Sequence, residues 1–199
     1  MTTPRRGRPP SGGREQILTA TYELLRDPGI ARLTTREIAT RAGVSEGSIF
    51  YHYGSRDGLL SAVFEQALTP LIALREQGIG TRGLPETLDT FTATVEEFLE
   101  RAVIVLFAAQ ADIDLRGGLH AFLAADPDRR PQRGIALVGD HLADLQAAGR
   151  IRAGIDVHTA AFLLVSSCFF RVGQPWLIGA APVPSRAAVL DTFLTMLAP

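Results

Sequence analysis

The side chains in this chain that are best suited to catalysis or metal binding are four histidines and one cysteine. The histidines, His52, His120, His141 and His158, are scattered without the spacing of metal ligands. The sequence contains no G-x-S-x-G nucleophile motif, no H-E-x-x-H motif, no phosphate-binding glycine loop and no Rossmann fingerprint. We therefore expect no enzyme activity, no metal site and no cofactor.

The single cysteine, Cys168, excludes an intrachain disulfide and a cysteine zinc cluster, which favours the reducing cytoplasm. A redox sensor is one interpretation of Cys168, but the residue lies in the most apolar predicted helix, where a buried and inert thiol is favoured. The N-terminal segment lacks the apolar region of a secretory signal peptide. The longest uncharged apolar stretches, such as 103–109 and 160–170, are shorter than the roughly 20 residues of a membrane span. We expect a cytoplasmic protein that does not cross a membrane.

Apart from the histidines, the basic residues that could bind an anionic partner are all arginines, because the chain contains no lysine. The 20 arginines face 21 acidic residues, so the net charge of −1 excludes a protein that coats nucleic acid by bulk charge. Residues 1–60 hold nine arginines and six acids, whereas residues 61–199 hold eleven arginines and fifteen acids. The first fourteen residues contain four arginines and no acid among Pro, Gly and Ser, which is typical of a disordered basic arm. Such an arm can follow nucleic acid, or it can be a solvated tail.

The elements that position these groups are predicted to be helical, because apolar residues recur with a period near 3.6 and no stretch alternates with period two. A first helix is expected over 13–26, with Ile17, Leu18, Thr21, Leu24 and Leu25 on one face. Thr34 and Glu37 form a capping-box pattern that starts a second, short helix. Gly43 suits the left-handed position that ends it, and Ser45 is the expected N-cap of a third helix.

Two short helices joined by a tight turn that contains glycine are typical of a helix-turn-helix, in which the second of the two helices reads DNA. That helix, 46–53, is rich in polar and amphipathic residues, and Ile49, Phe50 and Tyr53 are its expected anchors. Ser55 is expected to cap a fourth helix, which Pro70 should kink or shorten.

The run LTTREIATRAGVSEGSIFYHYGSRDGLL, preceded by the basic GRPP arm, resembles the DNA-binding domain of the TetR family of transcriptional regulators. The resemblance covers about fifty residues, from Arg14 to Phe64, and later segments are similar to the family only in outline. It implies an all-α fold, with an N-terminal three-helix helix-turn-helix domain and a C-terminal helical domain for ligand binding and dimerisation. We expect a basic arm at 1–13, a DNA-binding domain at 14–60 and the C-terminal domain at 61–199.

The resemblance also implies which residues meet DNA. Thr35 and Tyr51 would contact phosphates, Ser45, Ser48 and His52 would face the groove, and Arg56 would anchor the backbone. Hydroxyl groups and helix N-terminal amides do donate hydrogen bonds to phosphate oxygens, and a short helix fits the major groove. Two further groups have two interpretations each. Glu46 is interpreted as a carboxylate that the helix dipole favours, although it could accept a hydrogen bond from a cytosine amine. The arm arginines Arg5, Arg6 and Arg8 would enter the minor groove or add non-specific affinity for DNA.

The second part of the chain resembles the ligand and dimerisation domain of the family. Most of its aromatic residues are expected to be core, and a minority would line a pocket. The candidate ligand residues are Phe91, Phe98, Arg101, Phe107, Gln110, Arg116, His120 and Phe122. Segments 156–172 and 185–197 are apolar on more than one face, which indicates a partner surface. The resemblance implies a homodimer through a four-helix bundle, with Phe162, Leu163, Ser166, Phe170, Val189, Phe193 and Leu197 as candidate contacts.

These observations favour a homodimeric, sequence-specific repressor that binds a palindromic operator and is released by a small, largely apolar ligand. The alternative is a regulator without a ligand, whose C-terminal domain only dimerises or recruits a protein partner. A helical enzyme that carries a helix-turn-helix ranks last. An apolar cavity with convergent polar groups would favour the first hypothesis over the second.

Overall fold

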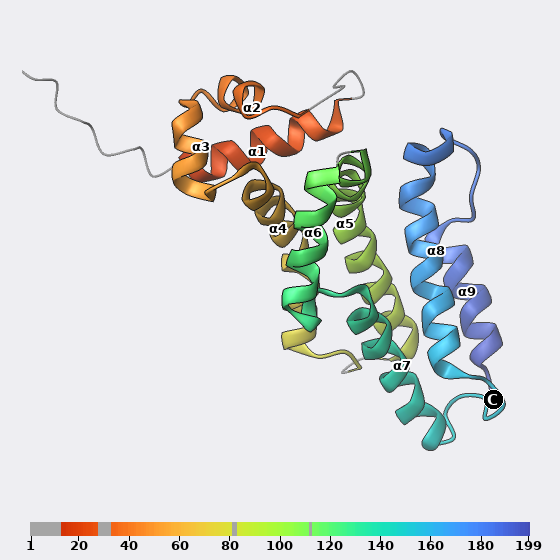
Figure 1. Cartoon of the computed structure of the whole chain (residues 1–199). Helices are drawn as coiled ribbons and strands as arrows, with labels where there is room; N and C mark the ends of the chain where they lie inside the picture. Colours follow the sequence, from red (N-terminus) through yellow and green to blue (C-terminus); the bar gives the residue numbers. More distant parts are fainter. Residues whose placement is uncertain (1–12, 28–32, 81–82, 112) are drawn as a thin grey trace, which may run out of the picture.

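The computed structural model describes residues 13–27, 33–80, 83–111 and 113–199, and within these ranges it contains helices and no strand. The expected all-α fold is thereby confirmed (Figure 1). The arm arginines Arg5, Arg6 and Arg8 lie outside the described residues. The helices are α1 (Gly13–Arg26), α2 (Thr35–Ala42), α3 (Glu46–Tyr53), α4 (Arg56–Gln77), α5 (Leu84–Ala111), α6 (Ile113–Ala125), the 3₁₀ turn η1 (Pro127–Arg129), α7 (Pro131–Ala147), α8 (Val157–Ile178) and α9 (Arg186–Leu197).

Local capping signals set the boundaries of the first helices. The Thr34 hydroxyl accepts a hydrogen bond from the Glu37 N–H, and the Glu37 carboxylate accepts from the Thr34 N–H, so the capping box is present. Gly43 ends α2 with a φ of 67°, a left-handed conformation that favours glycine. Only two residues later, Ser45 caps α3. The tight turn between α2 and α3 therefore follows directly from the sequence.

Two helices, α4 and α8, are longer than the sequence predicted. Helix α4 continues through Pro70 to Gln77, so Pro70 does not shorten it. Helix α8, expected to end near Val172, runs through Pro175 to Ile178. A proline inside a helix removes one hydrogen bond, and both helices have partly exposed surroundings there, where water can solvate the freed carbonyl.

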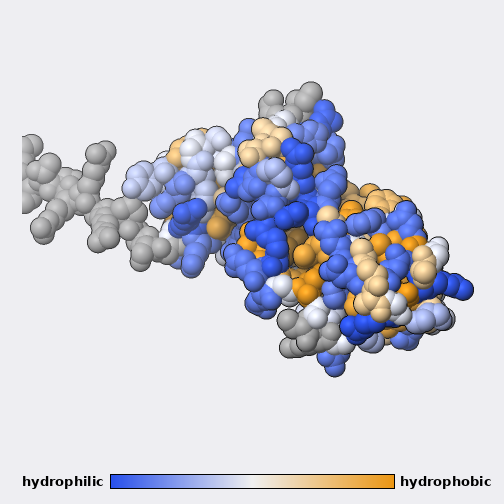
Figure 2. Space-filling model, turned by 90° about the horizontal axis from the view of Figure 1, so that it is seen from below, coloured by the Kyte–Doolittle hydropathy of each residue, from blue (hydrophilic) through white to orange (hydrophobic). Residues whose placement is uncertain are grey.

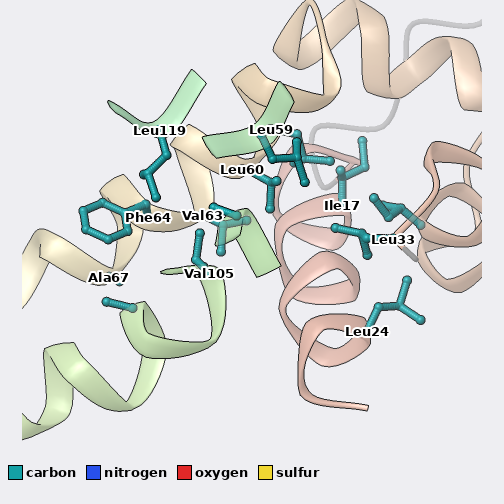
Figure 3. Close-up of a cluster of buried hydrophobic side chains, with 14 of the residues drawn as sticks. Ile17, Leu24, Leu33, Leu59, Leu60, Val63, Phe64, Ala67, Val105 and Leu119 are labelled. Atoms are coloured by element: carbon teal, nitrogen blue, oxygen red, sulfur yellow. The ribbon is translucent and has the colours of Figure 1, made fainter. Parts of the chain in front are cut away.

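The core consists of two clusters of buried side chains that share helix α5. The first cluster joins α1, α2 and α3 to α4, α5 and α6 through residues such as Ile17, Leu59, Phe64, Val105 and Leu119 (Figure 3). The second cluster joins α5 to α7, α8 and α9. Because α4 contributes to the first cluster along much of its length, the helix-turn-helix packs on the rest of the molecule through one continuous core.

Helices α4 and α8 are long and apolar enough to cross a membrane, by length and composition alone. The sequence-based expectation considered only uninterrupted apolar runs: the run 160–170 lies within the longer helix α8, the run 103–109 lies within α5, and α4 was not considered. The same test is passed by core helices of globular proteins. Both helices supply buried residues to the two clusters, among them Leu60 and Val63 from α4 and Ala161 and Leu164 from α8.

Candidate nucleic-acid interface and ligand cavity

Helix α3 presents one face to its neighbours and the other to solvent. Ile49 is fully buried, and the half-buried Tyr53 donates a hydrogen bond from its hydroxyl to the Arg14 carbonyl of α1 at 2.7 Å. Phe50, which we expected to be an anchor, is 48% exposed. The reason is helical spacing: Ile49 and Tyr53 are four residues apart and share a face, whereas Phe50 is rotated away from it. The anchoring expectation is therefore wrong for Phe50.

Four of the expected DNA-contacting groups lie on α3 or at its N-cap: Ser45 and Tyr51 are exposed, whereas Ser48 and His52 are half-buried. Tyr51 is 76% exposed, and its ring meets the His52 ring edge-on at a centroid distance of 5.1 Å. At the N-terminus of α3, the exposed Ser45 hydroxyl accepts from the Ser48 N–H at 3.2 Å, and the two serine hydroxyl oxygens are 2.8 Å apart. Tyr51, two serine hydroxyls and the free amides of a helix N-terminus form a surface able to donate hydrogen bonds to phosphates.

Glu46 joins α3 to α2. The Thr35 hydroxyl, at the start of α2, donates a hydrogen bond to the Glu46 carboxylate. Glu46 lies in the first turn of α3, where the helix dipole favours a negative charge. The hydroxyl expected to meet a phosphate is thus engaged by a carboxylate of the same chain. A phosphate that approaches Thr35 must compete with this carboxylate.

The start of α4 lies against α6. Arg56 is half-buried in the first turn of α4, and its neighbour Asp57 lies beside Gly118 of α6. A Cβ atom added to Gly118 would be 3.0 Å from the Asp57 Cβ, so glycine permits this close approach. The helix that follows α3 is therefore in close contact with α6 at its first turn.

A largely apolar cavity of about 320 Å³ lies among α4, α5, α6, α7 and α8. Seen from below, the molecule shows apolar surface inside a hollow that hydrophilic residues surround (Figure 2). The second half of α4 forms one wall, and Val165, Ser166 and Phe169 of α8 form another. The apolar lining residues are Phe64, Leu68, Leu71, Ile72, Leu74, Phe91, Val95, Phe98, Leu99, Leu106, Leu123, Leu137, Val165 and Phe169.

Charged groups are also part of the lining, and they come from the end of α4, from η1 and from the start of α7. Arg75 and Arg133 both contact the Asp128 carboxylate, at 2.7 and 3.2 Å. Arg129 lies over the Phe122 ring, with its guanidinium carbon 4.1 Å from the ring centroid, and contacts Glu65 at 3.2 Å. Arg130 and Ser166 complete the polar lining. We call the set Arg75, Asp128, Arg129, Arg130 and Arg133 the arginine cluster.

The candidate ligand residues from the sequence are distributed unevenly around this cavity. Phe91 and Phe98 line it. Phe107 packs beside the second core cluster, and Phe122 contacts Phe64 and Arg129 next to the cavity. The polar candidates are not part of the lining: Gln110 and His120 are exposed, Arg116 is half-exposed, and Arg101 pairs with Glu97 at 3.5 Å.

Sequence analysis missed the arginine cluster and the contribution of α8. A signal was present, because three arginines occur within five residues at 129–133, directly after two aspartates. The helical turn at η1 brings this run together with Arg75, which lies more than fifty residues earlier in the chain.

The outer faces of α8 and α9 expose large apolar side chains. Phe162, Leu163 and Phe170 are between 52% and 54% exposed on α8, whereas Ser166 and Val189 are half-buried. Phe193 and Leu197 of α9, also named as dimer candidates, are buried inside the protomer in the second core cluster. The spacing of α9 turns these two residues toward α5 and α8, which leaves the exposed α8 side chains as the larger apolar surface.

A group of charged residues holds α8 and α9 against α5. The Glu96 carboxylate of α5 contacts Arg171 of α8 at 2.8 Å and Arg186 of α9 at 3.4 Å. Arg171 also donates to the Pro184 carbonyl, and Arg186 contacts Asp89 at 3.2 Å. The Glu96 side chain is only 12% exposed. One carboxylate therefore positions both helices of the apolar outer surface.

Cys168 is buried within α8, as the sequence indicated. Burial, together with the nearby Glu96 charge, raises the pKa of its thiol to about 11. A thiol that stays neutral and inaccessible is a poor nucleophile, which agrees with an inert packing role.

Comparison with known proteins places this geometry in context. Residues 17–63 match the family of bacterial regulatory proteins described as the tetR family. The HTH-type transcriptional regulator BetI 1 from Chromohalobacter salexigens is 45% identical over 58 residues, which are 29% of each protein. The HTH-type transcriptional regulator YvkB from Bacillus subtilis is 26% identical over 157 residues, 78% of this chain and 80% of YvkB. A solved TetR-family regulator from Mesorhizobium loti superposes over 97% of this chain and 100% of its own, with a TM-score of 0.66 and 16% identity.

The comparisons thus support the resemblance to the TetR family of transcriptional regulators, which is carried by the helix-turn-helix segment 17–63. The matched segment, 17–63, covers the helix-turn-helix of the TetR family, and the likeness of the solved structure extends to the C-terminal helices at the level of the fold. The chain spans less than a third of the length of the curated relatives that it matches first. Proteins of the TetR family among these relatives are transcriptional regulators and not enzymes, in agreement with the expectation from the missing catalytic motifs.

Proposed function

We propose that this protein is a homodimeric TetR-family repressor that reads a near-palindromic operator with α3 and leaves it when a small molecule occupies the cavity. The observation that carries the proposal is the position of α4. Its N-terminal turn holds Arg56 directly after the reading helix, and its second half, from Phe64 to Arg75, forms a wall of the cavity. A ligand in the cavity would thus contact the helix on which the DNA-reading surface rests.

The DNA-binding part of the proposal is supported by the exposed polar face of α3. Phosphate contacts from Thr35, Tyr51 and Arg56 would fix the register, and Ser45, Ser48 and His52 would face base edges in the major groove. The chain carries a net charge of −1, so affinity must come from this local surface and from the basic arm at 1–13.

The dimeric part is supported by the apolar side chains exposed on α8. Phe162, Leu163 and Phe170 are costly to leave in water, and a second copy of the same face would bury them. A dimer presents two reading helices, and binding to successive major grooves requires a separation of about 34 to 36 Å. A ligand that favours another separation lowers operator affinity; a shift from 1:99 to 99:1 requires roughly 5.5 kcal/mol, shared between two sites.

The alternative is a regulator whose C-terminal domain only dimerises or recruits a protein. The presence of a cavity of about 320 Å³ with charged groups at one side favours the ligand-regulated function over this alternative. A cytoplasmic location follows from the proposed contact with genomic DNA.

The proposal is tested by measuring whether the cavity and the operator are coupled. A neutral apolar fluorophore, N-phenyl-1-naphthylamine, is titrated into the free protein and into the protein saturated with a duplex selected from a random pool. Because coupling is reciprocal, the fluorophore should bind the DNA-bound protein more weakly, and excess fluorophore should release the duplex. Equal affinity for both forms, with no release of DNA, would contradict the proposal and favour the ligand-independent alternative.

A further inference from the structure

We propose that the cavity takes an anionic amphiphile, a molecule with an apolar body and a single carboxylate or phosphate head held by the arginine cluster. The inference rests on the proposed role of the cavity as the effector site and specifies the chemistry of the effector. The walls provide the first half of the argument. Among the residues that the structure describes, the lining contains fourteen apolar side chains and one neutral polar side chain, that of Ser166, so the body of the ligand must be apolar.

The charges of the lining provide the second half. Within the described ranges, four arginines line the cavity together with one acidic residue, Asp128. Two of the guanidinium groups, those of Arg75 and Arg133, share that carboxylate. Glu65 and Asp126 lie outside the lining and contact Arg129. Even when these two carboxylates are counted, four positive groups face three negative ones.

Arg130 is the arginine whose charge is least compensated. In the part of the chain that the structure describes, its side chain donates to a neutral acceptor, the Ala124 carbonyl at 3.3 Å. Arg133 is the more exposed partner of Asp128, with 59% of its side chain accessible. An anionic head can therefore bind Arg130 without breaking an ion pair and can replace Asp128 at Arg133. Guanidinium groups bind carboxylate and phosphate with paired hydrogen bonds, which makes these heads the best match.

Arg129 gives the cluster its rigidity. Its guanidinium group stacks on Phe122 and donates to the Phe122 carbonyl at 3.5 Å, and it also contacts Glu65 on α4. These contacts fix the short segment that carries Arg130. A preorganised cationic segment loses little entropy when an anion binds, whereas a cationic or neutral head gains nothing from it.

The experiment compares three probes that carry a straight ten-carbon chain and differ in the headgroup: decanoate, decanol and decyltrimethylammonium. Binding to the full chain is measured by calorimetry and by displacement of N-phenyl-1-naphthylamine, with decyl phosphate as a second anion. Decanoate should bind about tenfold or more tightly than decanol, since a charge-assisted hydrogen bond contributes that factor, and the cation should bind weakest. Binding of decanoate and decyl phosphate with similar preference over decanol supports a general anion site.

The variants locate the effect. The double variant Arg130→Gln with Arg133→Gln should reduce the preference for decanoate over decanol by about tenfold and leave decanol affinity unchanged. The control Arg152→Gln removes one exposed charge of the same domain and should change neither value. The inference is overturned if decanol binds as tightly as decanoate, or if the double variant keeps the full preference. If decanol releases the operator as well as decanoate does, the inference about the headgroup fails, but the proposed role of the cavity as the effector site is retained. If no probe binds and the fluorophore shows no coupling to DNA, both proposals fail.

Discussion

The substitution Glu96→Gln removes the charge that holds α8 and α9 on α5 while it keeps the size of the side chain. Glu96 is 12% exposed and lies between Arg171 at 2.8 Å and Arg186 at 3.4 Å. Removing one partner of a fully buried ion pair costs about 3 to 5 kcal/mol, and an exposed pair contributes about 0.2 to 1 kcal/mol. Because Arg186 is partly exposed, we expect a loss between these limits, about 2 kcal/mol.

A loss of this size lowers the melting temperature by roughly 4 to 8 °C for a chain of this length. The adjacent substitution Glu97→Gln is the matched control, because Glu97 makes an exposed pair with Arg101 on the same helix. We expect the control to change the free energy of unfolding by no more than about 0.5 kcal/mol. The measurement is thermal and urea unfolding at one fixed protomer concentration, because dimer dissociation shifts the apparent stability.

A double-mutant cycle with Arg171→Met separates the ion pair from effects of the individual side chains. Glu96→Gln should have a smaller effect in the Arg171→Met background, and the effect that remains there reports the contact of Glu96 with Arg186. Equal melting temperatures for the Glu96 and Glu97 variants would refute the assignment of Glu96 as the residue that positions both helices.

Three further substitutions and treatments test other parts of the structure. Gly118→Ala should destabilise the protein by about 1 to 2 kcal/mol, because the new Cβ would crowd Asp57. Gly117→Ala on the same helix meets no atom within 4 Å and should stabilise the protein by about 0.5 to 1 kcal/mol. Urea unfolding compares the two variants, and changes of the same sign would contradict the close contact. Glu46→Gln removes a negative charge beside the proposed phosphate contacts and should tighten duplex binding about fivefold at low salt, as measured by fluorescence anisotropy, whereas weaker binding would show that the carboxylate itself contacts DNA. Because burial raises the pKa of Cys168 to about 11, the folded protein should resist a thiol reagent from pH 7 to 9 and react only when unfolded or near pH 11; rapid reaction at pH 8 would indicate an accessible thiolate.

The N-terminal helices could be predicted closely because their boundaries are encoded locally. Thr34 with Glu37, Gly43 and Ser45 each act within three or four residues, and the structure contains each of these caps. The exposure of Phe50 was missed because the short α3 buries only the face of Ile49.

The cavity could be predicted only in part, because distant segments build it. Phe91 and Phe98, named from the resemblance to the ligand domain of the family, do line the cavity, but the arginine cluster depends on the approach of η1 to the end of α4. No local pattern reports that Arg75 and Asp128 meet at 2.7 Å. The burial of Phe193 likewise depends on how α9 packs on α5, which periodicity alone does not determine.

Selection of bound duplexes from a random pool, followed by binding titrations at two salt concentrations, tests most directly whether a dimer reads DNA with two copies of α3. We expect a palindromic site whose half-sites lie one helical turn or a multiple of it apart, which two protomers bind and which the Tyr51→Ala variant binds more weakly. Enrichment of no sequence, with binding that depends only on salt and is unchanged by Tyr51→Ala, would contradict dimeric reading of DNA by α3.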